Sequence, residues 1–74
     1  MSNHPNRGRG ARCKSPTPAV IAQIRAEEKL SQKEAADLIC SGERTWQQWE
    51  AGDRRMHPAF WQLFLVRCSE RHMK

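Results

Sequence analysis

Two helix-start signals lie close together in the middle of this chain, and they constrain its fold more than any other feature. Residues 31–34 (Ser-Gln-Lys-Glu) have the spacing of a capping box, in which Ser31 caps the Glu34 amide and the glutamate reaches back. An apolar run follows over residues 35–39, and residues 40–42 (Cys-Ser-Gly) interrupt its periodicity. The sequence therefore predicts two short helices joined by a tight turn, the second over about residues 43–51 and ending at Gly52.

Proline marks the start of a further helix on each side of this pair. Thr17 is a good N-cap and Pro18 suits the first helical position, so we expect a helix from Pro18 that fades near Lys29. Pro58 opens a strongly apolar helix that we expect to fray near Cys68. Because no segment alternates with period two, we predict an all-α fold, a compact domain of four or five helices.

Charge divides the 74 residues into an arm and a body. Four of the five net positive charges lie in residues 1–17, which hold no acidic residue; they come from Arg7, Arg9, Arg12 and Lys14. We expect residues 1–16 to form a disordered basic arm, residues 17–68 to fold, and residues 69–74 to fray. Such an arm suits a polyanionic partner, although a solubilising tail explains the charge equally well.

The remaining composition argues against several classes of protein. The three cysteines form no disulfide ladder and no apolar run could cross a membrane, so we expect a cytoplasmic protein that does not bind membranes. Cys68 and His72 have helical spacing, but a zinc site normally needs four clustered ligands, and we predict no metal site. We also expect no enzyme activity, no cofactor and no small-molecule ligand, because no nucleophile, base and orienting acid cluster in the sequence.

The helix expected over residues 43–51 has two different faces. Trp46 and Trp49 share one side through their spacing, and long polar side chains occupy the start and the opposite side. Arginine pairs with guanine, glutamine with adenine, and glutamate accepts from cytosine, so this side could read base edges in a major groove. The same pattern also describes a solvated helix with two core tryptophans, and the helix alone does not decide between them.

The whole run from Leu30 to Gly52 closely resembles the lambda-repressor-like Cro/C1 family, also called XRE-type regulators, with a helix-turn-helix over residues 30–52. The flanking helices fit as well, so the resemblance covers about residues 17–66. Residues 45–52 and the following residues 54–58 look like small regulators of phages and mobile elements. Two positions depart from the family: Cys40 replaces its turn glycine, and Gly42 its usual serine cap. We expect Cys40 to be a small buried residue at the turn.

The resemblance implies a sequence-specific regulator of transcription, a repressor that binds a palindromic double-stranded DNA operator as a homodimer, with its own gene as one candidate target. It also assigns roles by position. Bases would be read by Glu43, Arg44, Gln47 and Gln48. DNA phosphates would be held by Gln32, Thr45, Arg54 and Arg55. Arg25 and Glu50 would form a partly buried ion pair between the first helix and the reading helix.

Three questions stay open at this point. We expect a dimer interface on the last helix, formed by Trp61, Phe64 and Leu65, although these side chains could instead belong to the monomer core. The basic arm could attract phosphates nonspecifically, enter a minor groove, or remain passive. The alternative function is a protein-binding module, such as an antitoxin or a phage inhibitor of a host nucleic-acid enzyme.

Overall fold

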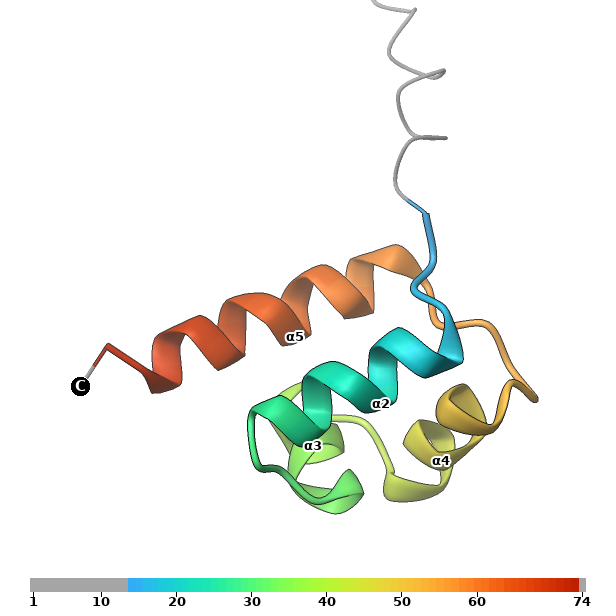
Figure 1. The fold of residues 1–74 in the computed structure, drawn as a ribbon, viewed down its shortest axis with the longest axis horizontal. Coiled ribbons are helices and arrows are strands. Elements are labelled where there is room, and N and C mark those ends of the chain that lie inside the picture. Colours follow the sequence, from blue (N-terminus) through green and yellow to red (C-terminus); the bar gives the residue numbers. More distant parts are fainter. Residues whose placement is uncertain (1–13, 74) are drawn as a thin grey trace, which may run out of the picture.

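A computed structural model describes residues 14–73, and within this range the chain forms four helices and no strand. The helices are α2 (Pro18–Glu27), α3 (Gln32–Leu38), α4 (Glu43–Ala51) and α5 (Pro58–Arg71). In the view of Figure 1, α2 lies between the long helix α5 and the pair formed by α3 and α4. The described part of the chain is therefore all-α, as predicted; most of the expected arm, residues 1–13, lies outside it.

The predicted helix starts are confirmed in detail. The Thr17 hydroxyl accepts from the Val20 amide at 3.2 Å, with Pro18 in the first helical turn. The Ser31 hydroxyl accepts from the Glu34 amide at 3.0 Å, while the Glu34 carboxylate accepts from the Ser31 amide at 2.8 Å. Both bonds of the capping box are present, so the start of α3 is set by local sequence.

The turn between α3 and α4 differs from expectation at Cys40. This residue has a left-handed backbone with φ of 57°, and its side chain is exposed rather than buried. The preceding Ile39, 5% exposed, fills the core beneath the turn, which leaves no inward place for the thiol. Gly42 serves as the N-cap of α4 with φ of −80°, so the left-handed geometry of the turn falls on a residue with a side chain.

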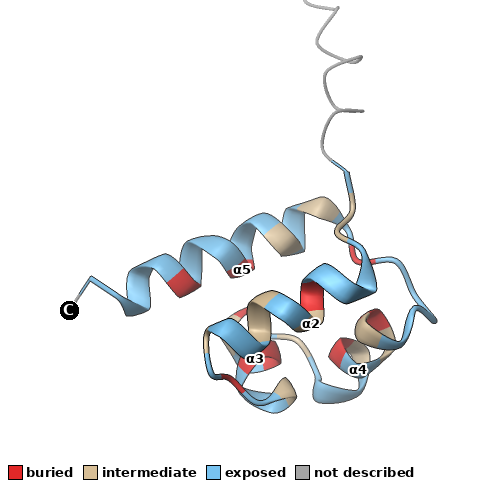
Figure 2. Cartoon of the chain, viewed as in Figure 1, coloured by how far each residue is buried: buried red, intermediate tan, exposed pale blue. Residues whose placement is uncertain are grey.

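An aromatic cluster between α4 and α5 forms the centre of the core. Trp46 and Phe64 are fully buried, with ring centroids 4.9 Å apart, and the Trp49 ring lies 5.7 Å from that of Trp46. Figure 2 marks the buried positions of each helix in red. Met56, in the connection between α4 and α5, is also buried, at 1% exposed. It is the apolar side chain of that connection, and the core takes it up because burial of its thioether chain is favourable.

The last helix is longer than predicted. It continues past Cys68 to Arg71, so the fraying expected from residue 69 does not begin there. The reason is a polar clamp on Glu28, just after α2: its Oε1 atom lies 3.2 Å from Arg71 Nη1 and 2.9 Å from His72 Nε2. None of the helices among the described residues is long and apolar enough to span a membrane.

Two left-handed residues, Cys40 in the turn between α3 and α4 and Gly52 at the end of α4, make a test of the fold. Cys40→Gly should raise the free energy of unfolding by about 0.5 kcal/mol, because relief of the left-handed strain exceeds the entropy cost of glycine. Gly52→Ala should lower it by about 1 kcal/mol, since Gly52 has φ of 85° and the new methyl group would meet only ordinary contact.

Urea denaturation of the purified variants measures both effects. Cys40→Ala is the matched control, because it removes the thiol and keeps the strain, and it should leave stability nearly unchanged. A Cys40→Gly protein less stable than Cys40→Ala would contradict this account of the turn.

Candidate functional site

Helix α4 is divided between a buried side and a polar side, as predicted. Trp46 is 0% and Trp49 5% exposed, which confirms that both indoles face inward. Of the predicted base-reading residues, Glu43, Arg44 and Gln47 are exposed and Gln48 is half-buried. Gln47 Nε2 lies 3.5 Å from Glu43 Oε2, a weak bond within the exposed face. The polar side chains are therefore free to meet a partner without disturbing the core.

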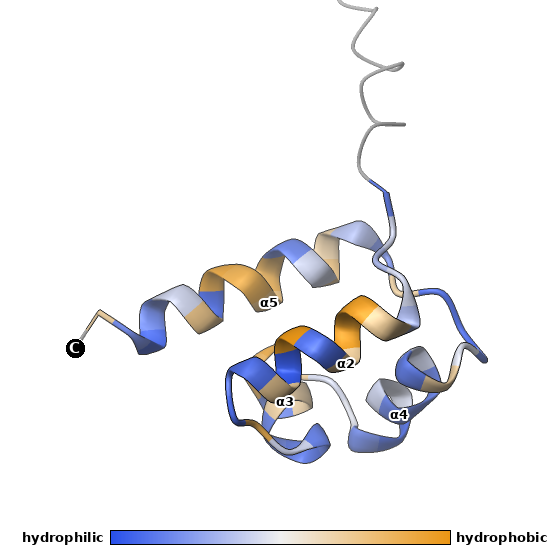
Figure 3. Cartoon of the chain, viewed as in Figure 1, coloured by the Kyte–Doolittle hydropathy of each residue, from blue (hydrophilic) through white to orange (hydrophobic). Residues whose placement is uncertain are grey.

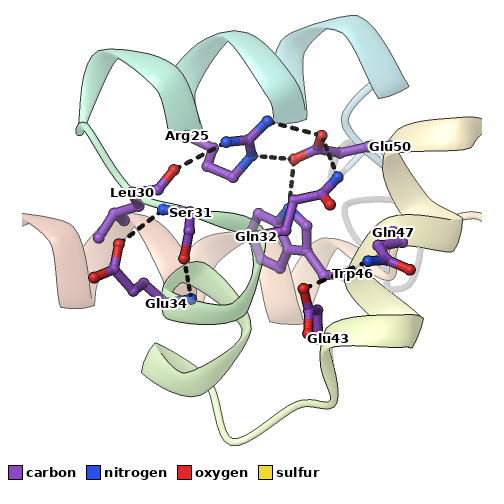
Figure 4. A network of polar contacts seen from close by, with 9 residues as sticks. All are labelled: Arg25, Leu30, Ser31, Gln32, Glu34, Glu43, Trp46, Gln47 and Glu50. Atoms are coloured by element: carbon purple, nitrogen blue, oxygen red, sulfur yellow. Dashed lines mark hydrogen bonds and ion pairs between the residues drawn. The ribbon is translucent and has the colours of Figure 1, made fainter.

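The Glu50 carboxylate, in the last turn of α4, joins three helices (Figure 4). Arg25 of α2 donates to it twice, from Nε to Oε2 at 2.5 Å and from Nη2 to Oε1 at 3.1 Å. Gln32 of α3 donates to Oε1 at 3.0 Å, and the Trp46 indole donates to Oε2 at 2.5 Å. The structure thus brings together Arg25 and Glu50, and adds Gln32, which was expected to brace this helix, and Trp46 as further donors.

Charge and hydrogen bonding both favour the ionised form of this carboxylate. Burial alone would raise the pKa of Glu50, but the hydrogen bonds from Arg25, Trp46 and Gln32 and the positive charge of Arg25 outweigh it, so the pKa lies below its ordinary value. The bond to Glu50 raises the pKa of Arg25 although burial opposes it. The Glu50 carboxylate, which accepts from charged Arg25 and from Gln32 and Trp46, is therefore a rigid anchor for α4.

The predicted phosphate-binding residues fall into two places. Thr45, Arg54 and Arg55 line one groove of about 250 Å³ beside α4, and both arginines are exposed. Gln32 lies elsewhere, in the Glu50 network. At 3.6 residues per turn, Thr45 and Glu50 point about 140° apart on α4. The structure therefore places these polar groups on two different flanks of the same helix.

The residues expected at a dimer interface do not form one surface. Phe64 is 0% exposed and stacks on Trp61 at 5.5 Å, so it belongs to the core and has no surface to offer a partner. Its position on α5 turns it toward Trp46 of α4, and Cys68, one turn later, is buried as well. Leu65 is 36% exposed and Trp61 is half-buried. The exposed apolar side chains in the middle of α5 are instead Leu63, Leu65 and Val66, which colour this stretch in Figure 3.

Two hydrogen bonds near the candidate site were not predicted from the sequence. The i, i+4 spacing of Trp46 and Glu50 would have allowed their hydrogen bond to be predicted. His57 caps α5, because its Nδ1 atom accepts from the Ala59 amide at 3.0 Å, and Pro58 at the first helical position was the available signal for a cap there.

Cys68 of α5 and His72, just after this helix, have different surroundings. Burial and the nearby charge of Glu28 raise the pKa of Cys68, although Arg71 opposes this, and the thiol is held in its neutral form. His72 contacts Glu28 instead. Within residues 14–73, no three histidine, cysteine, aspartate or glutamate side chains cluster so as to hold a metal ion.

Removal of the charge on Glu50 tests the anchor. Glu50→Gln keeps the shape of the side chain but leaves Arg25 partly buried without a counterion, and we expect a loss of about 2 kcal/mol in the free energy of unfolding. The control is Lys33→Met, which breaks the exposed Lys33–Asp37 pair at 3.2 Å and should cost less than about 0.5 kcal/mol. Equal losses in urea denaturation would show that the Glu50 network is no special anchor.

The stability difference between the wild type and Glu50→Gln should also depend on pH. The folded-state pKa of Glu50 lies below the unfolded value of about 4.3, so the carboxylate stabilises the fold fully above that value and loses this effect as pH falls through the folded pKa. We expect the stability gap between the wild type and Glu50→Gln to be constant from about pH 7 to 5 and to shrink below about pH 4. Thermal unfolding at constant ionic strength measures the gap, and a gap that widens in acid is inconsistent with the lowered pKa.

Comparison with known proteins adds one partial similarity. No family model matches the chain. The type II methyltransferase M.MspI of Moraxella sp. is 35% identical to it over 54 residues. That match covers 73% of this chain but only 13% of the methyltransferase, so the chain corresponds to a small part of that protein.

Proposed function

We propose that this chain is a sequence-specific DNA-binding regulator of transcription with a lambda-repressor-like fold, in which α3 and α4 act as a helix-turn-helix. The observation that carries the proposal is the division of α4. Its apolar side is buried and its last turn is anchored through Glu50, whereas its other side presents free polar groups. A reading helix needs both properties, because it must hold a fixed angle in the major groove while its side chains reach the bases.

The exposed face of α4 has the chemistry of base recognition. Arg44 can form a bidentate pair with guanine, Gln47 and Gln48 can pair with adenine, and Glu43 can accept from the amino group of cytosine. Gln47 gives only one of its amide hydrogens to Glu43, so its second hydrogen and its oxygen remain available for a base. These four side chains would read a short segment of mixed sequence.

The flanks of α4 suit the two backbones that border a major groove. Thr45, Arg54 and Arg55 would hold phosphates on one side. On the other side, Gln32 keeps one amide hydrogen beyond its bond to Glu50 and could donate it to a phosphate. Such contacts set the register of α4 on DNA and carry no sequence information themselves.

Two copies acting on a palindromic operator would complete the regulator. The exposed apolar stretch of α5 includes Leu63 and Val66, which share one side of the helix through their i, i+3 spacing, and this side is the surface we propose for the pairing of two copies. In this arrangement the protein would repress transcription in the cytoplasm by occupying a promoter, including that of its own gene, as small phage and mobile-element regulators do. The same apolar stretch favours the second candidate function, a module that binds a different protein.

The similarity to a methyltransferase fits a binding role for the shared segment. Cys68 is held as a buried neutral thiol, which makes it a structural residue rather than a nucleophile. We propose that the segment binds DNA and does not itself transfer a methyl group. In a chain that carries a catalytic part as well, it would be the part that selects a DNA site.

Substitution of the reading face tests the function directly. Duplexes selected by the wild-type protein from random sequences provide the probe, and dyad symmetry in them would indicate two bound copies. Arg44→Ala and Gln48→Ala should each relax the preference at one base position, a loss of about 1–3 kcal/mol in discrimination.

Arg67→Ala, which removes a charge from α5 without touching α4, is the matched control and should keep the wild-type preference. The proposal fails if the wild type selects no sequence, or if both reading variants select the same sites as the control. A complex with another protein that resists high salt, with no binding to DNA, would establish the second candidate instead.

A further inference from the structure

A second and larger groove, of about 1040 Å³, lies beyond the end of α4. It is bounded by residues 14–18, by the connection between α4 and α5, and by the first turn of α5. Arg54, Arg55 and His57 line this groove and also the smaller groove that contains Thr45. These residues separate the two grooves and belong to both. Together the grooves run from the side of α4 to the segment that precedes α2.

The charges along these grooves have one sign. Arg54, Arg55 and Lys14 are the charged side chains that line them, all three are exposed, and no aspartate or glutamate lines either groove. The floor of the larger groove includes Pro16 and Pro18, which can pack against a sugar. A polyanion with apolar units between its charges therefore complements this surface.

His57 presents a hydrogen-bond donor to the same surface. Its Nδ1 atom is occupied as the acceptor of the Ala59 amide bond at 3.0 Å, which fixes the neutral ring in the tautomer with hydrogen on Nε2. The side chain is exposed, and it lines both grooves. His57, which caps α5 through Nδ1, therefore has its Nε2–H group available for a molecule bound where the two grooves meet.

We infer that a DNA backbone strand continues from Thr45 past Arg54 and Arg55 into the larger groove, where His57 and Lys14 bind phosphates outside the base-read segment. This inference rests on the proposed function and extends its DNA contacts. A backbone strand is favoured over a small anion because the arginines belong to both hollows, and because the exposed basic side chains border open channels rather than one enclosed cavity. Affinity would then depend on flanking duplex whose bases the protein does not read.

Two variants and one control test these contacts. Lys14→Ala removes a charge, and His57→Asn keeps a good capping oxygen while it removes the ring N–H. With a duplex selected by the wild type, each should weaken binding by about 3–10-fold, equally for preferred and unrelated sequences. Lys14→Ala should also reduce the slope of log K against log salt by about 0.9, the value expected for one phosphate contact. Arg67→Ala should change neither quantity.

Shortening of the duplex provides a second measurement. Removal of base pairs beyond the selected segment should weaken wild-type binding and leave binding by the Lys14→Ala/His57→Asn double variant almost unchanged. If the wild type prefers a sequence but both single variants match Arg67→Ala in affinity and salt slope, the extended contact is overturned while the proposed function stands. If the wild type binds no duplex, the proposed function itself has failed.

Discussion

One carboxylate holds helix α4 in place. Glu50 accepts hydrogen bonds from Arg25 of α2, from Gln32 of α3 and from Trp46 of its own helix, so a single group is shared by three helices. The group is only partly buried, but even partial burial of a carboxylate is costly unless its acceptor sites are satisfied. A small shift of α4 would break several of these bonds at once, and the orientation of the helix is therefore defined more sharply than apolar contact alone would define it.

The aromatic side chains extend this anchor to the last helix. The Trp46 ring packs on Phe64 at 4.9 Å while its indole nitrogen donates to Glu50, so one side chain links the polar network to the core. Trp49 in turn lies 5.8 Å from Phe60, near the start of α5. A tryptophan suits this place because it combines a large apolar ring with a single donor that needs one acceptor. Trp46 thus connects the polar contacts of α4 at Glu50 with its apolar contacts to α5.

Local sequence predicted the helices well and the tertiary contacts less well. The capping box at Ser31 and Glu34, the cap at Thr17 and the stop at Gly52 depend on neighbours in the chain, and the structure contains all of them. The burial of Phe64 and Met56 and the extension of α5 depend on residues far away in sequence, as with the clamp on Glu28. The spacing of Trp46 and Trp49 defined the polar face of α4, whereas the two grooves that flank it required the fold of the connection after Gly52.

The side chains that face outward from α4 have almost no share in holding the domain together. Arg44 and Gln47 lie outside the core and outside the Glu50 network, and the bond between Gln47 and Glu43 is a weak one at the surface. Mutations at these positions would therefore be nearly neutral for folding. Substitutions on this face can therefore accumulate one residue at a time without passing through an unfolded intermediate, and the same freedom makes the face a natural target for randomised libraries.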